Sequence, residues 1–300
     1  MLPILPLRFE LQQQQSLRLP YHAGSMLRGA FGMALKKLAC ITKQKDCKTC
    51  PLYRSCPYTQ IFETPVPVNA ENQQAVNPYI IQAPTMGERI IYSGETWNFG
   101  MTLVGKAIDQ LPLIAYAWQK ACEGGFSSAQ SQANLLGIYQ GENCIYQANG
   151  SLNHHSTITI DTPALTNQTR LHFVTPLRLQ ANNHIMLCAE QITASHLLIT
   201  LAKRVQRMME LHTHQPLTLD FPALLTQAKE IRLSTQLQRA TVPRYSNRQQ
   251  QAMNLEGLMG TVTLHGELGG FAPLLHLGEY IHVGKSATFG LGRYSILTGE

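Results

Sequence analysis

Four of the seven cysteines lie close together near the N-terminus, at Cys40, Cys47, Cys50 and Cys56. Thiolates at this density suit a tetrahedral Zn²⁺ ion, which would hold together a loop that is too polar to order itself. Four protein ligands leave no coordination position open, so we expect a structural zinc ion rather than a catalytic one. An iron–sulfur cluster also satisfies four cysteines and remains the alternative, with free thiols as the third interpretation.

A second cluster lies near the C-terminus, in the stretch HVGKSATFGLGRYS at 282–295. Its glycines let the chain approach another backbone closely and point N–H groups at a phosphate, while its lysine and arginine add positive charge. Its phenylalanine offers a face on which a base could stack. The predicted nucleic-acid contacts here are Gly284, Lys285, Ser286, Phe289, Gly290, Gly292 and Arg293.

The same stretch is not a nucleotide-binding Walker A loop, although Gly284-Lys285-Ser286 resembles the end of one. The first glycine of that motif would fall at position 279, which is Glu279, and glycines interrupt the helix that should follow. The alternative interpretation of the stretch by itself is a glycine-rich turn between a helix and a strand.

The charge of the chain favours an anionic partner. Lysine and arginine number 24 against 18 acidic residues, which gives a net charge of +6 and a pI near 8.9. Nucleic acid is favoured over a membrane because no basic amphipathic stretch stands out. Arg244, Tyr245 and Arg248 form a further predicted nucleic-acid contact, since two arginines and a tyrosine fall within a few positions.

The first 15 residues contain no basic segment ahead of their apolar residues, and two prolines interrupt those residues. A signal peptide is therefore not expected, and no apolar run reaches the roughly 18 residues of a membrane-spanning helix. We expect a cytoplasmic protein whose cysteines are thiols or metal ligands rather than disulfides.

The elements that must position these residues follow one order twice. In each half, apolar periodicity predicts strand, helix, two strands, helix and strand, the ferredoxin-like order. With 300 residues and 44% apolar content, two domains with separate cores are expected. We predict an α+β protein with tandem ferredoxin-like domains at 1–150 and 169–300, joined by a polar linker at 151–168.

The expected elements of the first half are a strand at 4–11, a helix at 26–40 capped by Ser25, a cysteine-rich loop at 40–67, strands at 79–82, 88–92 and 96–104, a helix at 107–122 and a closing strand pair. Those of the second half are a strand at 171–179, a helix at 192–211, strands at 236–241 and 258–264, a helix at 268–277 and a final strand after Gly292.

Several segments, taken in order, resemble one known family. GSMLRGAFGMALKKLAC, CPYTQIFETP, FVTPLRL, RYSNRQ, EGLMG and FAPLLHLGEYIHVGKSATFGLGRYSI are similar to segments of the repeat-cleaving endoribonucleases of CRISPR systems, which belong to the RAMP superfamily. The resemblance implies that repeat RNA binds in a cleft of the tandem domains and that the glycine-rich loop contacts its backbone. It also implies cleavage without a metal ion, by attack of a ribose 2′-OH that leaves a 2′,3′-cyclic phosphate.

Such a reaction needs a base, an acid and positive charge near the phosphate. The resemblance places these groups near the start of the first helix, where His22 and Tyr21 precede it and Arg28 could face the phosphate. Lys36, on the same helix, is a third catalytic candidate. Relatives often carry a histidine where this chain has Met33, so His22 would have to replace it.

The expected partners are CRISPR repeat RNA, the guide RNA made from it and other subunits of a CRISPR effector complex. The alternative function is that of a non-catalytic RNA-binding subunit on the same fold, because a fold does not determine an activity. Met33 is the residue that keeps this alternative open.

Overall fold

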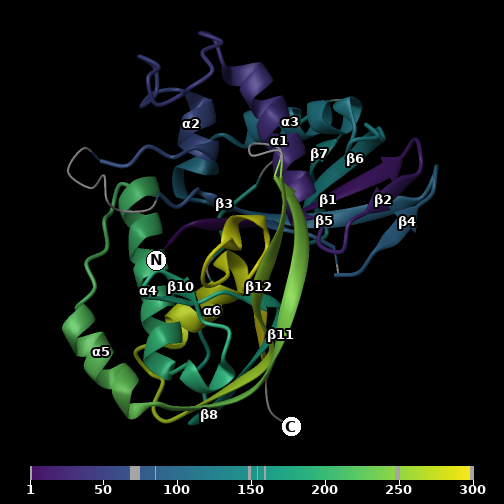
Figure 1. Cartoon of the computed structure of the whole chain (residues 1–300). Helices are drawn as coiled ribbons and strands as arrows, with labels where there is room; N and C mark the ends of the chain where they lie inside the picture. Colours follow the sequence, from purple (N-terminus) through teal and green to yellow (C-terminus); the bar gives the residue numbers. More distant parts are fainter. Residues whose placement is uncertain are drawn as a thin grey trace. The chain divides into compact units, whose positions relative to one another are not determined.

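The structure is a computed structural model, drawn in Figure 1, that describes residues 2–67, 75–84, 86–147, 150–153, 155–158, 160–246 and 251–297. Side chains at 244–246 and 251–252 are outside this description. The chain divides into two compact units, Met1–Ile158 with Leu211–Thr213, and Thr159–Glu210 with His214–Glu300. The division therefore falls in the polar segment that was expected to join two domains.

The first unit is built on a five-stranded antiparallel sheet in the order β3-β5-β1-β6-β7. Its strands are β1 (Ile4–Gln13), β3 (Tyr79–Gln82), β5 (Thr96–Val104), β6 (Ala133–Gln140) and β7 (Asn143–Gln147), and its long helices are α1 (Gly24–Ala39) and α3 (Leu111–Gly124). A separate pair, β2 (Leu17–Leu19) and β4 (Arg89–Ile91), lies beside them. Without β7, this is the ferredoxin-like order, with the first strand between the third and the fourth.

Aromatic rings join the two helices of this unit to its sheet. Phe9 and Phe99 lie opposite each other on β1 and β5, and their rings stack at 4.9 Å. Trp118 of α3 lies 4.6 Å from Phe99 and stacks on Phe31 of α1 at 5.1 Å. Each such pair contributes about 0.5–1.5 kcal/mol beyond the area that it buries, so the cluster holds α1 and α3 on the sheet.

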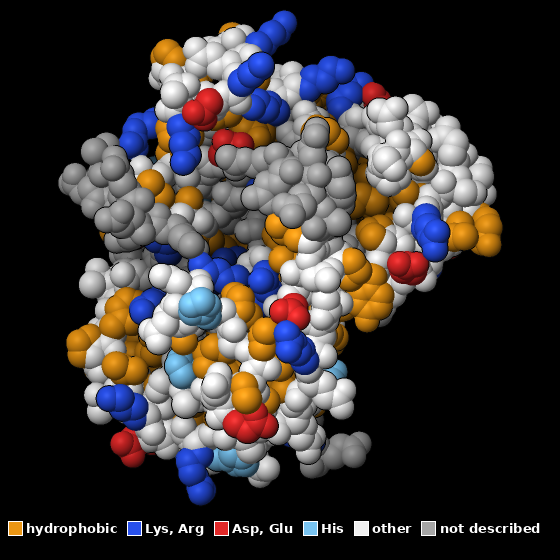
Figure 2. All heavy atoms as spheres, in the orientation of Figure 1, with side chains coloured by type: hydrophobic (Ala, Val, Ile, Leu, Met, Phe, Trp, Pro, Cys, Tyr) orange, Lys and Arg blue, Asp and Glu red, His pale blue; other side chains and the backbone are white. Residues whose placement is uncertain are grey.

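A cysteine-rich insertion follows α1 and leads into the short helix α2 (Pro57–Phe62). Phe62 presses against α1 at Gly32, where a Cβ atom would overlap the phenylalanine ring. Gly32 therefore lets α2 dock directly on α1, and the insertion is held at that end. Figure 2 shows Lys and Arg side chains gathered on this part of the surface.

The second unit repeats the arrangement with a four-stranded antiparallel sheet in the order β11-β12-β8-β13. The strands are β8 (Gln168–Leu177), β11 (Arg232–Ser246), β12 (Gln251–His265) and β13 (Tyr294–Leu297), with helices α4 (Ala194–His212), α5 (Phe221–Glu230) and α6 (Ala272–Ile281) and a short pair, β9 (Gln180–Ala181) and β10 (His184–Ile185). Two bonds to backbone oxygens tie α6 in place: Tyr294 Oη donates to Leu275 at 2.6 Å, and Arg204 Nε donates to Ile281 at 3.0 Å. The predicted α+β class with tandem ferredoxin-like topology is confirmed.

The pair β11 and β12 is much longer than predicted. Both strands have 15 residues, whereas β8 pairs with β12 only from Leu258 to His265. The remaining part of the pair forms a two-stranded arm beyond the four-stranded sheet, visible as the long green and yellow-green ribbons in Figure 1. The sequence prediction missed this extension, although the arm includes Val242 and Leu255, which lie opposite each other and are buried.

Several predicted boundaries are wrong. The first helix begins after Ala23, without a side-chain cap from Ser25. The second begins at Leu111 instead of 107, because residues 105–107 form a 3₁₀ turn and Pro112 fits the first turn of a helix. Helices α2 and α5 were not predicted. None of the helices in the described part of the chain is long and apolar enough to cross a membrane.

Candidate nucleic-acid interface

The glycine-rich loop connects α6 to β13. Backbone hydrogen bonds join it to the end of β8 and to the residue that follows β8. The Lys285 amide donates to the Arg178 carbonyl at 2.9 Å, and the Gly292 amide donates to the Pro176 carbonyl at 2.9 Å. Within the loop, the Val283 amide donates to the Gly292 carbonyl at 3.1 Å. These bonds give the loop a fixed backbone path.

Two glycines make this path sterically feasible. Gly284 has φ +90° and its backbone passes so close to residue 178 that a Cβ atom would lie 2.7 Å from the Arg178 carbonyl oxygen. Gly292 has φ +67°, and a Cβ atom there would overlap the Val283 carbonyl oxygen. Both angles lie in the left-handed region, and both approaches exclude a side chain, so glycine is required by geometry at these positions.

The loop amides are largely used inside the protein. Those of Lys285, Phe289, Gly290 and Gly292 all donate to carbonyl oxygens of the same unit. The expectation that these amides point at a phosphate is therefore corrected, because each is already paired. Phosphate binding by the loop would have to come mainly from its side chains.

Three cationic side chains belong to this region: Arg178, Lys285 and Arg293. The Arg178 side chain links the loop to β12. Its Nη1 donates to Ser286 Oγ at 3.0 Å, and its Nε donates to the Glu256 carbonyl at 2.8 Å. Burial and then the charge of Arg178 lower the pKa of Lys285, and burial lowers the pKa of Arg293. Partly desolvated cations of this kind are stabilised when an anion binds beside them.

Arg178 was not among the predicted contacts, although the segment FVTPLRL that contains it carried the family resemblance. Phe289 was expected to stack on a base, but it is only 8% exposed in this conformation. Arg248 lies outside the described residues, and the side chains of Arg244 and Tyr245 do as well.

The catalytic candidates of the first unit lie before and within α1. His22 is only 3% exposed, and burial lowers its pKa to about 4. Its Nε2 has no hydrogen-bond partner within the described part of the chain. Tyr21 is 40% exposed, and the Arg28 guanidinium lies 4.2 Å from the centre of the Phe62 ring. His22 is therefore neutral at pH 7, and in this conformation it is covered while Tyr21 is accessible.

Lys36 cannot work on the same phosphate as His22. It lies 12 residues along α1 from Gly24, a rise of about 18 Å. Its Nζ donates to the Lys45 carbonyl at 3.5 Å and lies 5.4 Å from the centre of the Tyr58 ring. The prediction that groups Lys36 with His22 is therefore corrected, because Lys36 lies at the far end of α1 and contacts the cysteine-rich insertion.

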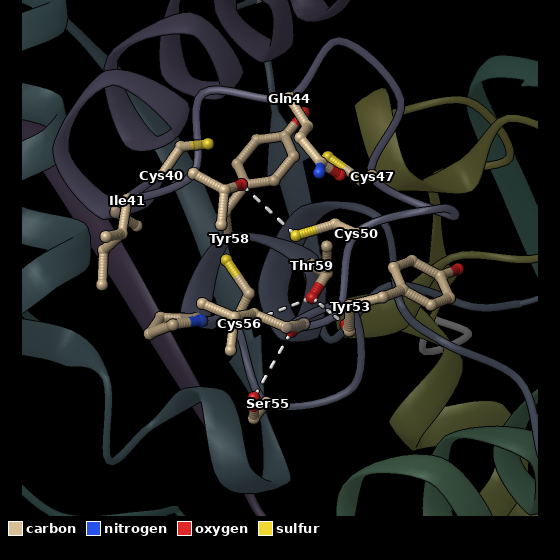
Figure 3. Close-up of a pocket in the computed structure, with 14 residues that line it drawn as sticks. Cys40, Ile41, Gln44, Cys47, Cys50, Tyr53, Ser55, Cys56, Tyr58 and Thr59 are labelled. Carbon is tan, nitrogen blue, oxygen red and sulfur yellow. Dashed lines mark hydrogen bonds between the residues drawn. The ribbon is translucent and has the colours of Figure 1, made fainter.

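The four clustered cysteines line a single cavity of about 230 Å³ in that insertion, as Figure 3 shows. One of them, Cys50, contacts Thr42, with 3.3 Å between Sγ and Oγ1. Burial and then the charge of Glu63 raise the pKa of the Cys47 thiol. Nevertheless, no three His, Cys, Asp or Glu side chains of the described ranges are grouped so that they could hold a metal ion. The thiols share a cavity without forming a ligand set.

Comparison with protein families now identifies domains in the chain. Residues 171–294, which include β8 and the glycine-rich loop, match the family described as CRISPR-associated endoribonuclease Cas6. Residues 2–157 match the family AF_1859_N, described as an N-terminal domain. The C-terminal part of the chain therefore carries the domain of the Cas6 family. No curated protein matches the sequence significantly.

Solved Cas6 structures share the fold of the whole chain. A product complex of Thermus thermophilus Cas6 (TTHB231) has a TM-score of 0.59 at 13% identity. The match covers 98% of this chain and 100% of the Thermus chain. A Cas6-related protein from Pyrococcus furiosus has a TM-score of 0.53 at 10% identity, with 99% and 100% covered. A partial Cas6-RT-Cas1–Cas2 complex has a TM-score of 0.56 at 14% identity, and the match spans 100% of this chain and 46% of that one.

The buried His22 makes stability depend on pH. Its folded pKa of about 4 lies below the ordinary histidine value of about 6.5, so the unfolded state binds more protons between these values. Stability contributed by the neutral imidazole is present above pH 6.5 and is lost as the pH falls toward 4. From pH 7 to pH 5 the wild type should lose about 2 kcal/mol more unfolding free energy than His22→Gln, measured by urea denaturation. Equal losses would show that His22 is not buried in solution.

The cations of the loop predict a salt effect on RNA binding. Lys285→Ala and Arg293→Ala should each weaken binding of the cognate repeat RNA and lower the slope of log K against log salt by about 0.7–0.9. Lys229→Ala, which removes an exposed lysine from α5, is the matched control and should keep the slope. Fluorescence anisotropy over a potassium chloride series measures all three. Wild-type slopes in both loop variants would exclude the loop from the RNA contact.

Proposed function

We propose that this protein cuts CRISPR precursor RNA within its repeats, without a catalytic metal ion, and so produces guide RNAs. The ribose 2′-oxygen attacks the adjacent phosphorus, and its proton passes to a base. The bond from phosphorus to the 5′-oxygen breaks, and that oxygen receives a proton from an acid. The products are a 2′,3′-cyclic phosphate and a 5′-OH end.

One observation carries this proposal: the segment that matches the endoribonuclease family includes the glycine-rich loop and its anchor on Arg178. Lys285 and Arg293 supply positive charge there, which suits an RNA phosphate. After cleavage, the partners that we propose are the guide RNA and other subunits of an effector complex.

In the first unit we assign proton transfer to His22, with Tyr21 as its exposed neighbour and Arg28 as a cation near the phosphate. A neutral imidazole can accept the 2′-OH proton once the side chain is uncovered, because general bases act in their deprotonated form. Burial lowers the pKa of His22 to about 4 only while the side chain is covered, and uncovering it returns the pKa toward the ordinary histidine value of about 6.5. The contribution of His22 to the rate should therefore fall between pH 7 and pH 5.5, as the uncovered imidazole becomes protonated.

A second function, RNA binding without cleavage, is favoured by one feature. His22 is buried, and the position where relatives often carry a histidine is Met33, which is 64% exposed on α1. If uncovering His22 does not occur, the first unit has no histidine at the surface near the start of α1. The protein would then retain repeat RNA as a binding subunit.

Cleavage of the cognate repeat distinguishes these functions. The wild type should cut at one phosphate at a rate that EDTA does not change, and a 2′-deoxy nucleotide just upstream of that phosphate should abolish the cut. His22→Asn should lower the single-turnover rate by about 10²–10⁴ with little loss of RNA affinity. Cleavage of the deoxy substrate would instead require a water nucleophile.

Met33→His provides the complementary variant. If the wild type binds the repeat but does not cut it, a histidine at this exposed position of α1 should introduce cleavage on the same RNA. Met33→Gln is the control, because it is polar and similar in length but does not titrate. Binding without cleavage in the wild type, together with a gain in Met33→His, would establish the non-catalytic function and locate the missing group.

We also propose that the four thiols of the insertion bind one structural zinc ion, with an iron–sulfur cluster as the alternative. The support is that Cys40, Cys47, Cys50 and Cys56 line one cavity. The sulfur atoms would have to move together, since they are not yet arranged as ligands. Metal binding would then offset the cost of ordering a polar loop.

Elemental analysis tests the metal proposal directly. The purified protein should contain about one zinc per chain, and Cys47→Ser or Cys50→Ser should lose both the zinc and thermal stability. Cys188→Ser, an exposed cysteine outside the cavity, is the control and should retain the metal. A brown protein that contains iron would support the cluster, and metal-free protein of unchanged stability would refute both.

A further inference from the structure

The end of α1 and the cysteine-rich insertion together contain most of the excess positive charge of the protein. Between positions 36 and 56 the sequence has six basic residues, Lys36, Lys37, Lys43, Lys45, Lys48 and Arg54, and one acidic residue, Asp46. The formal net charge of this segment is +5, compared with +6 for the whole chain. The excess of basic over acidic residues is therefore concentrated in one segment of the first unit.

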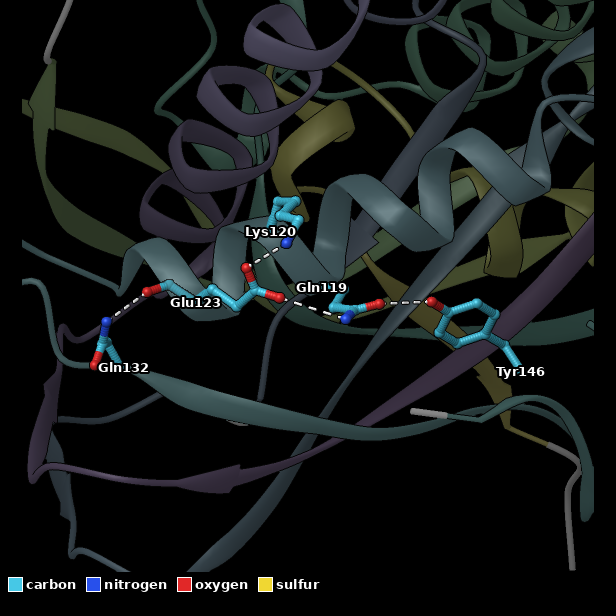
Figure 4. A network of polar contacts seen from close by, with 5 residues as sticks. All are labelled: Gln119, Lys120, Glu123, Gln132 and Tyr146. Atoms are coloured by element: carbon cyan, nitrogen blue, oxygen red, sulfur yellow. Dashed lines mark hydrogen bonds and ion pairs between the residues drawn. The ribbon is translucent and has the colours of Figure 1, made fainter. Parts of the chain in front are cut away.

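The lysines at the tip of the insertion are exposed and are not neutralised by carboxylates. None of the ion pairs found among the described residues includes Lys43, Lys45 or Lys48. Asp46 instead accepts the Lys48 amide at 3.0 Å, a bond that shapes the local turn. Lys120 on α3 shows the contrasting case, because its Nζ lies 2.6 Å from Glu123 (Figure 4).

The insertion presents these lysines from an ordered backbone. The Cys50 amide donates to the Cys47 carbonyl at 3.1 Å, Thr49 Oγ1 donates to the Asp46 carbonyl at 3.2 Å, and Lys36 reaches the Lys45 carbonyl. Lysines held near one another in this way repel, and the repulsion is relieved when a polyanion binds.

We propose that the lysine surface, defined as Lys43, Lys45 and Lys48, binds the phosphates of single-stranded RNA that extends beyond the repeat. This inference rests on the proposed function, because it assumes that the substrate is part of a longer transcript. It adds a second RNA contact that is separate from the glycine-rich loop of the other unit. The lysines act by charge and should not select a base sequence.

A membrane fits the lysine surface less well than RNA does. Binding at a membrane surface usually relies on an amphipathic helix with a broad apolar face, whereas the stretch from Cys40 to Cys56 consists of turns and bends. Zinc on the four thiolates would not abolish the charge of the surface. Four thiolates and one Zn²⁺ together carry −2, which leaves a formal +3 on residues 36–56.

Binding of two RNA probes tests this inference. One probe is the cognate repeat alone, and the other is the same repeat with ten unpaired uridines at each end. In about 50 mM salt, the extension should raise wild-type affinity roughly tenfold, and K43Q/K45Q/K48Q should abolish that gain. The salt slope for the extended probe should fall by about 2, since each single-strand phosphate contact contributes about 0.7.

Two matched variants separate charge from other effects. K43R/K45R/K48R keeps the charge and should keep the gain, and K106Q/K203Q/K229Q removes three exposed lysines elsewhere and should also keep it. The inference is overturned if the wild type gains nothing from the extension, or if the glutamine variant gains as much. Lysine-dependent sedimentation with phosphatidylserine vesicles, without any gain from RNA, would likewise overturn it and identify a membrane contact.

The proposed cleavage is tested separately. The wild type either cuts the unextended repeat or does not, and that result concerns the proposed function alone. The affinity gain on the extended probe can be measured in both cases, so failure of cleavage does not remove the test of the lysine surface.

Discussion

The backbone at the end of β8 is the constraint on which the second unit depends. Its carbonyl oxygens at Pro176 and Arg178 accept the amides of Gly292 and Lys285, so the loop after α6 must pass directly against it. A Cβ atom at Gly284 would lie too close to the Arg178 carbonyl oxygen, and one at Gly292 would overlap the Val283 carbonyl oxygen of the loop itself. Because the loop is fixed in this way, the cationic side chains on it are presented from a rigid backbone, and little conformational entropy is lost when they bind an anion.

The first unit uses a close contact of a different kind. Phe62 packs against Gly32 on α1, and this contact attaches the cysteine-rich insertion to a helix that the aromatic cluster holds on the sheet. The insertion is therefore coupled to the core at α2, while its lysines remain exposed. A feature added to an ancestral ferredoxin-like unit in this manner can acquire its own charge and ligands without altering the sheet beneath it.

The fold class could be predicted from the sequence because the structure has the order of helices and strands that the apolar periodicity predicts. The strand at β1 and the helix at α1 were predicted from apolar spacing, and the repeated order predicted two similar sheets. The arrangement of the candidate site was harder to predict from the sequence. The burial of His22 and the internal pairing of the Lys285 amide depend on residues far away in sequence, and the length of the arm at β11 and β12 follows from pairing rather than from alternation. Arg178 could have been found, since it lies in a segment that already carried the resemblance.

The strand β11 also has a consequence for the behaviour of the protein at high concentration. It forms the edge of its sheet, and no strand of the described ranges pairs with its outer side along its 15 residues. A long open edge is a template on which a second copy could add a strand and begin to aggregate. Arg232 and Arg239 place charge along this edge, and Pro243 lacks the amide that such pairing would need. These residues therefore oppose the addition of a further strand at this edge.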